Sequence, residues 1–332
     1  MDYFIKRHIP FYYLYDTKGS ELYNEITQLE QYYPYRSEEE ILNKYASEMI
    51  DLKDETNFEA ITLVEFGAGY SLKTEIILKK LLLKYKRVTF VPIDVSPSAC
   101  EYSDQKYSQI PHLTVKPYVG TYDNFLLDKI TYPTRVFYLW LGSSIGNLAE
   151  NERIEILKKI SDKLTPVDRL LMGLDTVYKD KSIIYKAYND DKGVTRKFIM
   201  NILTHLKYKY DLSIKEEDFM YDGVWNDELF RMEMYIKCLN TTEIKSNATS
   251  QKVKIKAGER ILIEYSHKFS TDSCAKMAEK SNLVQTKVWY TDNKYFMFST
   301  FVKNGQQQTN NGGAVLENNL KTNGSMFCFC FA

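Results

Sequence analysis

The stretch Leu63-Val64-Glu65-Phe66-Gly67-Ala68-Gly69 decides the fold that we predict for this chain of 332 residues. An apolar run ends in an acid, a glycine-rich turn follows, and residues 76–84 then carry apolar side chains at helical spacing. A strand that passes through a glycine turn into a helix brings backbone close to a ligand at the carboxyl end of a parallel sheet. A side chain at Gly67 or Gly69 would block that approach, so both glycines are candidate ligand contacts.

The next predicted strand, residues 88–93, ends at Asp94. In nucleotide-binding folds an acid at this distance from the glycine turn binds ribose hydroxyls. The full G-x-G-x-x-G pattern is absent, because Leu72 and Lys73 stand where further glycines would fall. A ribose-binding acid without a pyrophosphate turn indicates a nucleoside ligand that lacks a diphosphate, and S-adenosylmethionine (SAM) fits that description. The alternative for this stretch is an ordinary strand-to-helix turn without a ligand.

Composition narrows the class of protein further. The 44 basic and 44 acidic residues balance, which argues against a nucleic-acid partner. The five cysteines form no C-x-x-C pair, which indicates a reducing compartment and no bound metal. The start of the chain lacks the apolar core of a signal peptide, and no apolar run reaches the length of a membrane span. We therefore expect a cytoplasmic protein with no membrane partner, and a monomer.

Predicted strands alternate with helices in the first half of the chain, at residues 61–66, 88–93, 113–118, 135–141 and 168–174. This order predicts a parallel, doubly wound α/β sheet. A second module is then inserted, with a helix over residues 183–209 and strands at residues 230–239 and 261–269. Residues 284–289 and 295–301 follow as an antiparallel hairpin that closes the first sheet, as in seven-stranded methyltransferase sheets.

The two ends of the chain differ from this pattern. Near the start, Ser20 is predicted to cap one helix, and Ser37 with Glu40 forms a capping box that opens a second. Residues 304–332 are rich in Gln, Asn and Gly, so we expect a disordered tail.

Several stretches along the chain carry distinctive sequence motifs. They are Tyr15-Asp16-Thr17-Lys18-Gly19-Ser20, Tyr32-Tyr33-Pro34-Tyr35-Arg36, Glu65-Phe66-Gly67-Ala68-Gly69 with Lys73-Thr74, Pro92-Ile93-Asp94-Val95-Ser96, Leu141-Gly142-Ser143-Ser144-Ile145-Gly146-Asn147, Ala187-Tyr188-Asn189-Asp190, Val224-Trp225-Asn226, Met232-Glu233-Met234 and Ile263-Glu264-Tyr265-Ser266. Together they resemble the histidine-specific, SAM-dependent methyltransferases of ergothioneine biosynthesis, over roughly residues 10–303.

The resemblance implies two domains. A Rossmann-like SAM-binding methyltransferase domain would comprise residues 43–178 and 269–303. A substrate-binding α+β domain would comprise residues 1–42 and 179–268, with the active site between the two.

The resemblance also implies the cofactor contacts. They are Gly67 and Gly69 at the methionine part of SAM, Lys73 at its carboxylate, Asp94 at the ribose, Gly142 in the loop after the fourth strand, and Asp123 near the adenine. A solvated helix lysine is the alternative for Lys73. The adenine contact departs from the family, which commonly carries Gly-Asp-Phe where this chain has Gly120-Thr121-Tyr122-Asp123. Either Asp123 or Thr121 would supply that contact.

The substrate contacts implied by the resemblance come from both domains. They are Tyr15, Tyr23 and Tyr32 around the amine and imidazole, Asn147 at the amine and carboxylate, Tyr188 and Thr195 at the carboxylate, and Met234, Glu264 and Ser266 at the imidazole. Glu264 and Ser266 are two apart on a strand and so share a face, where an acid accepts an imidazole N–H. Solvated or core positions are the alternatives for Glu264, Tyr23 and Met234.

The predicted reaction is Nα-methylation of L-histidine to the trimethylated betaine hercynine, with Tyr15 and Asn147 orienting the amine. Tyrosine faces would stabilise the growing cation. Two alternatives stay open at this point. One is an N-methyltransferase for another amino acid, such as a tryptophan derivative, and the other is a non-catalytic SAM-fold binding module.

Overall fold

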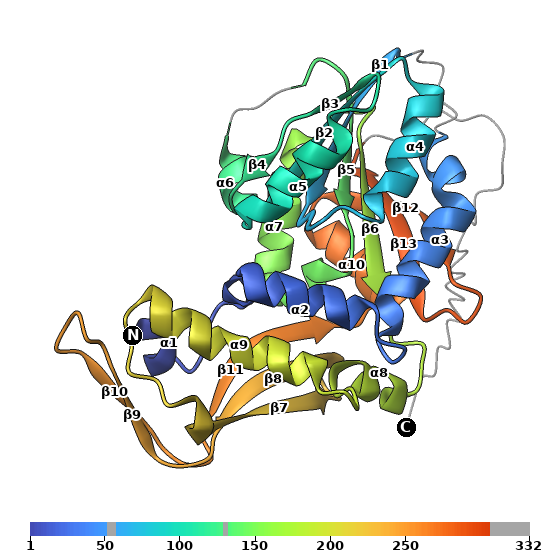
Figure 1. Ribbon diagram of the computed structural model, residues 1–332. Coiled ribbons are helices and arrows are strands. Elements are labelled where there is room, and N and C mark those ends of the chain that lie inside the picture. Colours follow the sequence, from blue (N-terminus) through green and yellow to red (C-terminus); the bar gives the residue numbers. More distant parts are fainter. Residues whose placement is uncertain (52–57, 129–131, 306–332) are drawn as a thin grey trace, which may run out of the picture.

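The computed structural model describes residues 1–51, 58–128 and 132–305. Within these ranges the larger sheet has eight strands and occupies the upper part of Figure 1. Its main path is β12 (Leu283–Tyr290), β13 (Phe296–Lys303), β6 (Arg169–Asp175), β5 (Arg135–Trp140), β1 (Ala60–Phe66), β2 (Arg87–Asp94) and β3 (Leu113–Val115), and β4 (Tyr118–Val119) also pairs with β2. Strands β1 to β6 pair in parallel, which confirms the predicted doubly wound sheet.

The order of these strands creates a crevice. Strand β1 lies between β2 and β5, so the chain leaves β1 towards one side of the sheet and later returns on the other. Ligands of open α/β sheets bind at the carboxyl ends of the strands where the order reverses in this way. The far edge is closed by β12 and β13, which pair antiparallel with each other, while β13 pairs antiparallel with β6, as predicted for the closing hairpin.

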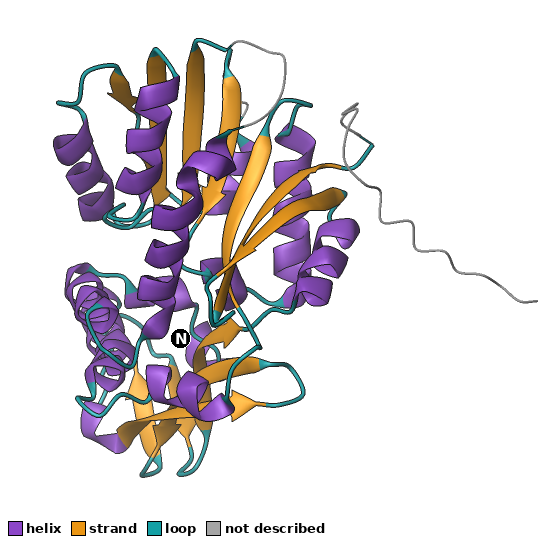
Figure 2. Ribbon diagram, turned by 90° about the vertical axis from the view of Figure 1, so that its right-hand side faces the viewer, coloured by secondary structure: helices purple, strands orange, loops and turns teal. Residues whose placement is uncertain are grey.

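Helices cover both faces of the larger sheet (Figures 1 and 2). Because side chains alternate along a strand, Ile61 and Leu63 of β1 pack on one face, and Val64 and Phe66 pack on the other. The first face is buried under α3 (Tyr33–Ile50), α4 (Thr74–Lys84) and α5 (Pro97–Tyr107). The second is buried under α6 (Tyr122–Leu127), α7 (Glu150–Lys163) and α10 (Thr271–Lys280).

The described residues also form a second sheet of three antiparallel strands, β7 (Phe219–Asn226), β8 (Arg231–Cys238) and β11 (Arg260–His267). Its strands β8 and β11 confirm the predicted ones, whereas β7 was not predicted. Figure 1 shows α2 (Thr17–Thr27) and α9 (Val194–Lys209) side by side between the two sheets. The remaining elements are α1 (Asp2–Ile5), α8 (Lys181–Tyr188), the hairpin of β9 (Thr242–Lys245) and β10 (Lys252–Ile255), and 3₁₀ helices at Phe11–Leu14, Ser144–Asn147 and Glu216–Asp218.

Three predicted helix boundaries are wrong. The helix over residues 183–209 is broken, because Gly193 adopts a φ of +66° and Asp190 accepts the main-chain N–H groups of Val194 and Thr195, so that α9 starts anew. Asp16, not Ser20, caps α2, since its carboxylate accepts the Gly19 N–H at 2.7 Å. Helix α3 starts at Tyr33 with Pro34 in its first turn, four residues before the predicted capping box.

The predicted division into domains stays a prediction, and its boundary at residues 42 and 43 falls inside the continuous helix α3. Residues 306–332 of the predicted tail lie outside the described part of the chain. Among the helices that the structure describes, none combines the length and apolar character needed to cross a membrane.

Candidate active site

Two adjoining cavities lie between the carboxyl edge of the larger sheet and strand β11. The larger, of about 480 Å³, is lined by all the predicted cofactor residues, which are Gly67, Gly69, Lys73, Asp94, Asp123 and Gly142. The smaller, of about 50 Å³, is lined by all the predicted substrate residues, which are Tyr15, Tyr23, Tyr32, Asn147, Tyr188, Thr195, Met234, Glu264 and Ser266. Tyr15, Tyr23, Asn147 and Glu264 line both cavities, so the two sets of residues meet at these four side chains.

The glycine turn after β1 forms the floor of the larger cavity. Gly67 and Gly69 have φ angles of +66° and +50°, in the left-handed region that favours glycine. The Gly67 N–H donates to the Ile93 carbonyl at 2.9 Å, which ties the turn to the end of β2. A Cβ atom at Gly67 would lie 2.7 Å from the Tyr122 hydroxyl, so only glycine fits. The turn therefore exposes backbone to the cavity, as predicted.

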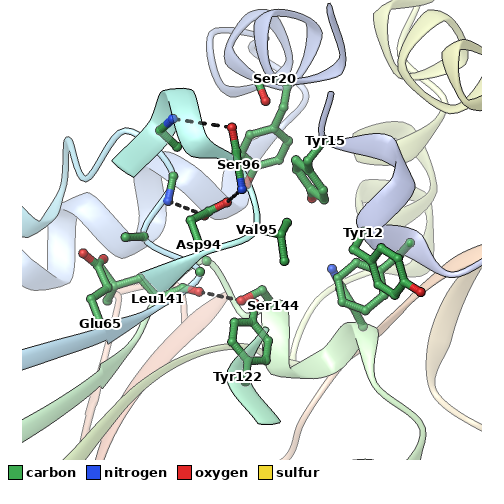
Figure 3. A pocket seen from close by; sticks show the side chains of 18 of the residues that line it. Tyr12, Tyr15, Ser20, Glu65, Asp94, Val95, Ser96, Tyr122, Leu141 and Ser144 are labelled. Atoms are coloured by element: carbon green, nitrogen blue, oxygen red, sulfur yellow. Dashed lines mark hydrogen bonds between the residues drawn. The ribbon is translucent and has the colours of Figure 1, made fainter. Parts of the chain in front are cut away.

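Asp94 ends β2 and holds the loops beside it. One carboxylate oxygen accepts the Gly69 N–H at 2.8 Å, and the other accepts the Ser96 N–H at 2.9 Å, as Figure 3 shows. Burial raises the pKa of Asp94 above its ordinary value, although the main-chain donors favour the charged form. The carboxylate lines the larger cavity, where its remaining lone pairs can accept from the hydroxyls of a nucleoside.

Lys73 lines the same cavity, and its ammonium is paired with Glu38 of α3. Glu38 is fully buried, and both of its oxygens accept from the Gly142 N–H at 2.9 Å. Gly142 opens the loop after β5 with a φ of +70°. Glu38 thus links the lysine to that loop. Glu38 was not among the predicted site residues, because it lies more than a hundred residues from Gly142 in the sequence.

The loop before α6 carries the departure from the family pattern. Thr121 caps α6, because its hydroxyl accepts the Asn124 N–H at 3.3 Å. The Tyr122 ring packs edge-on against Trp140, with centroids 4.9 Å apart. The Asp123 carboxylate pairs with Lys159 at 2.7 Å. Both Thr121 and Asp123 line the larger cavity, so both candidates for the adenine contact stay in place.

Glu264 lies where the two cavities meet. The Asn147 side-chain amide donates to Oε1 of Glu264 at 2.8 Å. Burial raises the pKa of this carboxyl to about 8, and the Lys268 ammonium lowers it by a smaller amount. Met234 stands directly opposite Glu264 in the pairing of β8 with β11 and is buried. The pocket thus offers a carboxyl group beside an apolar side chain, an arrangement that suits a flat ring with an N–H.

The hydroxyls of Tyr188 and Ser266 lie 2.8 Å apart at the end of the smaller cavity. The Lys268 ammonium donates to both, at 2.7 Å and 2.8 Å, and pairs with Asp175 at 2.7 Å. Lys268 follows β11 directly and is buried. Lys268 was not predicted as a site residue, because nothing in the sequence connects it with Asp175 and Tyr188, which lie far earlier in the chain. Thr195, at the start of α9, is buried beside the same cavity.

Aromatic rings form one wall of the site. The Tyr15 ring packs edge-on against Tyr23 and Phe198, with centroids 5.8 Å and 5.6 Å away. Tyr32 packs against Tyr188 at 6.1 Å. Burial, followed by the charge of Glu264, raises the pKa of Tyr15 well above its ordinary value, so its hydroxyl stays protonated. Phe198 was missed, but its position three residues after Thr195 on one helix face is a signal that would have found it.

The comparisons with known proteins agree with this geometry. The family model described as "Histidine-specific methyltransferase, SAM-dependent" matches residues 4–303. A histidine N-alpha-methyltransferase of Mycolicibacterium smegmatis is 32% identical over 86% of this chain and 87% of that protein. One of Mycobacterium tuberculosis is 31% identical over the same shares of the two chains. Ergothioneine biosynthesis protein 1 of Neurospora crassa is 29% identical over 87% of this chain and 32% of that protein.

Proposed function

The chain belongs to the histidine-specific, SAM-dependent methyltransferases, and on that premise we propose that it transfers methyl groups to the α-amine of L-histidine. Membership makes it an enzyme whose methyl donor is SAM. The product we propose is the trimethylated betaine hercynine, a step of ergothioneine biosynthesis. The proposal extends to a monomer in the cytoplasm, with the substrate bound between the two predicted domains.

The observation that carries the choice of histidine is the buried Glu264 with Asn147 on one oxygen and Met234 opposite. A carboxyl group buried among apolar and aromatic side chains costs free energy unless a ligand bonds to it. The imidazole of histidine has an N–H to donate and flat faces that pack against methionine. The indole of tryptophan also has an N–H but is larger, so the small volume of the smaller cavity, about 50 Å³, favours histidine.

The larger cavity fits the methyl donor. The backbone of Gly67 and Gly69 would lie against its methionine part, and Asp94 would hold the ribose hydroxyls. Lys73 would face its carboxylate, and either Thr121 or Asp123 would lie near its adenine. When bound, SAM supplies a methyl group that is already activated by the sulfonium charge.

The contribution of the protein is alignment and desolvation. Tyr15 and Asn147 line both cavities, so they lie where the amine of the substrate would meet the methyl group. Holding two reactants in line contributes about 7–11 kcal/mol. The α-amine has an ordinary pKa of about 8, so a protonated substrate must lose a proton before it attacks. We propose that solvent takes this proton and that Tyr15 orients the lone pair.

The test is calorimetric titration of the purified protein with histidine, with and without S-adenosylhomocysteine, followed by mass spectrometry of a reaction with SAM. We expect mass gains of one to three methyl groups on histidine. Binding of S-adenosylhomocysteine without turnover of histidine would redirect the proposal to another amino acid, which a substrate panel including tryptophan would identify. A protein that binds no S-adenosylhomocysteine would be a non-catalytic module.

A further inference from the structure

We propose that Lys268 is a positioning residue that makes the substrate pocket select a ligand with a free α-carboxylate. It does so by donating to the Tyr188 and Ser266 hydroxyls, so that this pair has one O–H left, which it can donate to a ligand. The inference rests on the proposed function, since it concerns the carboxylate end of the same amino-acid pocket.

The Lys268 ammonium makes all of its hydrogen bonds within the protein. It has three hydrogens and three acceptors, which are Asp175 at 2.7 Å, Tyr188 at 2.7 Å and Ser266 at 2.8 Å. The Lys268 side chain is fully buried and does not line either cavity. It therefore acts on a ligand through the two hydroxyls and not by direct contact.

The contacts of Lys268 determine which way the hydroxyl hydrogens of Tyr188 and Ser266 can point. An ammonium only donates, so the Tyr188 and Ser266 oxygens each accept from Lys268. The two hydroxyls are 2.8 Å apart, so one of them donates to the other and one O–H is left over. We assign the free O–H to Tyr188, because the family resemblance places Tyr188 at the substrate carboxylate, and Ser266 then donates to Tyr188. The pair then presents a donor, and a ligand must offer an acceptor.

The charges around Asp175 also favour an anionic ligand. Asp175 pairs with Lys268 and Lys179, whose side chains are both buried, so two ammoniums share one carboxylate. Burial opposes the charge of Asp175, but the lysines lower its pKa below the ordinary value, so it stays ionised. Asp175 itself lines the smaller cavity, but the two lysines paired with it give these three side chains a formal charge of +1. An anionic acceptor such as a carboxylate is favoured over a neutral one at this position.

The backbone around Asp175 and Lys268 is held in place by further contacts. Asp175 ends β6, and Lys268 follows β11, at the two places where the chain crosses between the sheets. The neighbouring residues Thr176 and Phe269 form a parallel bridge. The Tyr33 hydroxyl also donates to Asp175, at 2.9 Å. The crossover thus holds Lys268 in place, which keeps both hydroxyls oriented before any ligand binds.

The experiment compares histidine with histamine, which lacks the carboxylate, by calorimetry in saturating S-adenosylhomocysteine. In Lys268→Met we expect the preference for histidine over histamine to fall about tenfold to a hundredfold, the range for a charged hydrogen bond. Lys179→Met is the matched control, because it removes the other ammonium from Asp175 without touching Tyr188 or Ser266. It should change the preference by less than about threefold, as for an indirect charge effect.

Several outcomes would overturn the proposal. Equal losses for histidine and histamine in Lys268→Met would assign Lys268 a structural role only. Equal losses of preference in both lysine variants would assign the effect to net charge and not to hydroxyl orientation. If Lys268→Met does not fold, Tyr188→Phe carries the test, since it deletes the assigned donor, and an unchanged preference in that variant contradicts the proposal. If the unmodified protein rejects histidine, the proposed function fails separately, and the ratio is measured with the amino acid that binds and its decarboxylated amine.

Discussion

The Asn147 amide donates to Glu264 at 2.8 Å, and this bond joins the loop after β5 of the larger sheet to β11 of the smaller one. Both side chains line both cavities. One carboxyl oxygen of Glu264 is occupied by Asn147, so the other is available to a ligand. Asn147, which we assign to the reacting amine, therefore orients Glu264, which we assign to the imidazole.

At pH 9, above the pKa of about 8 of Glu264, replacing Glu264 by Gln is expected to weaken histidine binding by about tenfold or more, because a charge-assisted acceptor for the imidazole N–H becomes a neutral amide. The affinity for S-adenosylhomocysteine should stay within about threefold, since Gly69 and Asp94 are untouched. Calorimetry of each ligand measures both effects. Glu243→Gln, on the hairpin strand β9 outside both cavities, is the matched control. Parallel losses for both ligands would remove Glu264 from the histidine pocket.

Two buried carboxyl groups predict how stability depends on pH. Burial raises the pKa of Glu264 and of Glu65 to about 8, against an ordinary value of about 4.3. The folded state therefore holds protons that the unfolded state releases between these values. Their contribution to the free energy of unfolding is fully present below pH of about 4.3, falls as the pH rises and is lost by about pH 8, by at most about 5 kcal/mol per group.

The variant Glu264→Gln tests this prediction, because glutamine mimics the protonated form at every pH. Its free energy of unfolding relative to the unmodified protein should rise by about 3 kcal/mol between pH 5.5 and pH 8.5. Urea unfolding of both proteins without ligands at the two pH values measures that difference, in which the titration of all other groups cancels. A difference that is the same at both pH values would contradict the assigned pKa.

Site residues could be predicted from the sequence when the residues they contact lie close to them along the chain. Gly67, Gly69 and Asp94 belong to one strand-turn-helix-strand unit, and parallel strands bring such ends to one edge, so local pattern was sufficient. Positions further along the chain came from the family resemblance. Glu38 and Lys268 were missed because their partners are set by tertiary packing. Local competition also made one predicted helix cap wrong, since Asp16 and Ser20 both suit an N-cap and the structure has Asp16 in that position.

The pair of Lys73 and Glu38 predicts a stability effect that a double variant reverses. Lys73→Met would leave the fully buried Glu38 carboxylate without its cation, at a cost of about 3–5 kcal/mol in the free energy of unfolding. Adding Glu38→Gln removes the charge, keeps an acceptor for the Gly142 N–H, and should restore most of that loss. Urea unfolding of the four proteins in this cycle gives the coupling.

The same cycle separates stability from cofactor binding. If Lys73 faces the carboxylate of SAM, the double variant should still bind S-adenosylhomocysteine about tenfold more weakly, the usual loss for one charged hydrogen bond, although its stability has returned. Recovery of stability together with full affinity would make Lys73 a partner of Glu38 alone. Additive losses of stability would mean that the two side chains do not interact.

The aromatic wall predicts which round of methylation is most sensitive to mutation. Tyr15, Tyr23 and Phe198 pack around one part of the smaller cavity, with Tyr15 and Phe198 centroids 5.6 Å apart. A ring face stabilises a quaternary ammonium by about 0.5–2 kcal/mol, so Phe198→Leu should slow the third transfer by about twofold to thirtyfold. The earlier rounds produce amines that can shed their charge and should slow less. Time-resolved mass spectrometry would then show dimethylhistidine accumulating.

The matched control for this prediction is Phe198→Tyr, which keeps a ring face in the same place. It should release the trimethylated product with little dimethylhistidine. Equal slowing of all three rounds in Phe198→Leu would point to a loss of packing around Tyr15 and not to a loss of cation stabilisation. An unchanged product distribution would place the growing cation away from Phe198, against Tyr32 and Tyr188, which line the same cavity with their rings 6.1 Å apart.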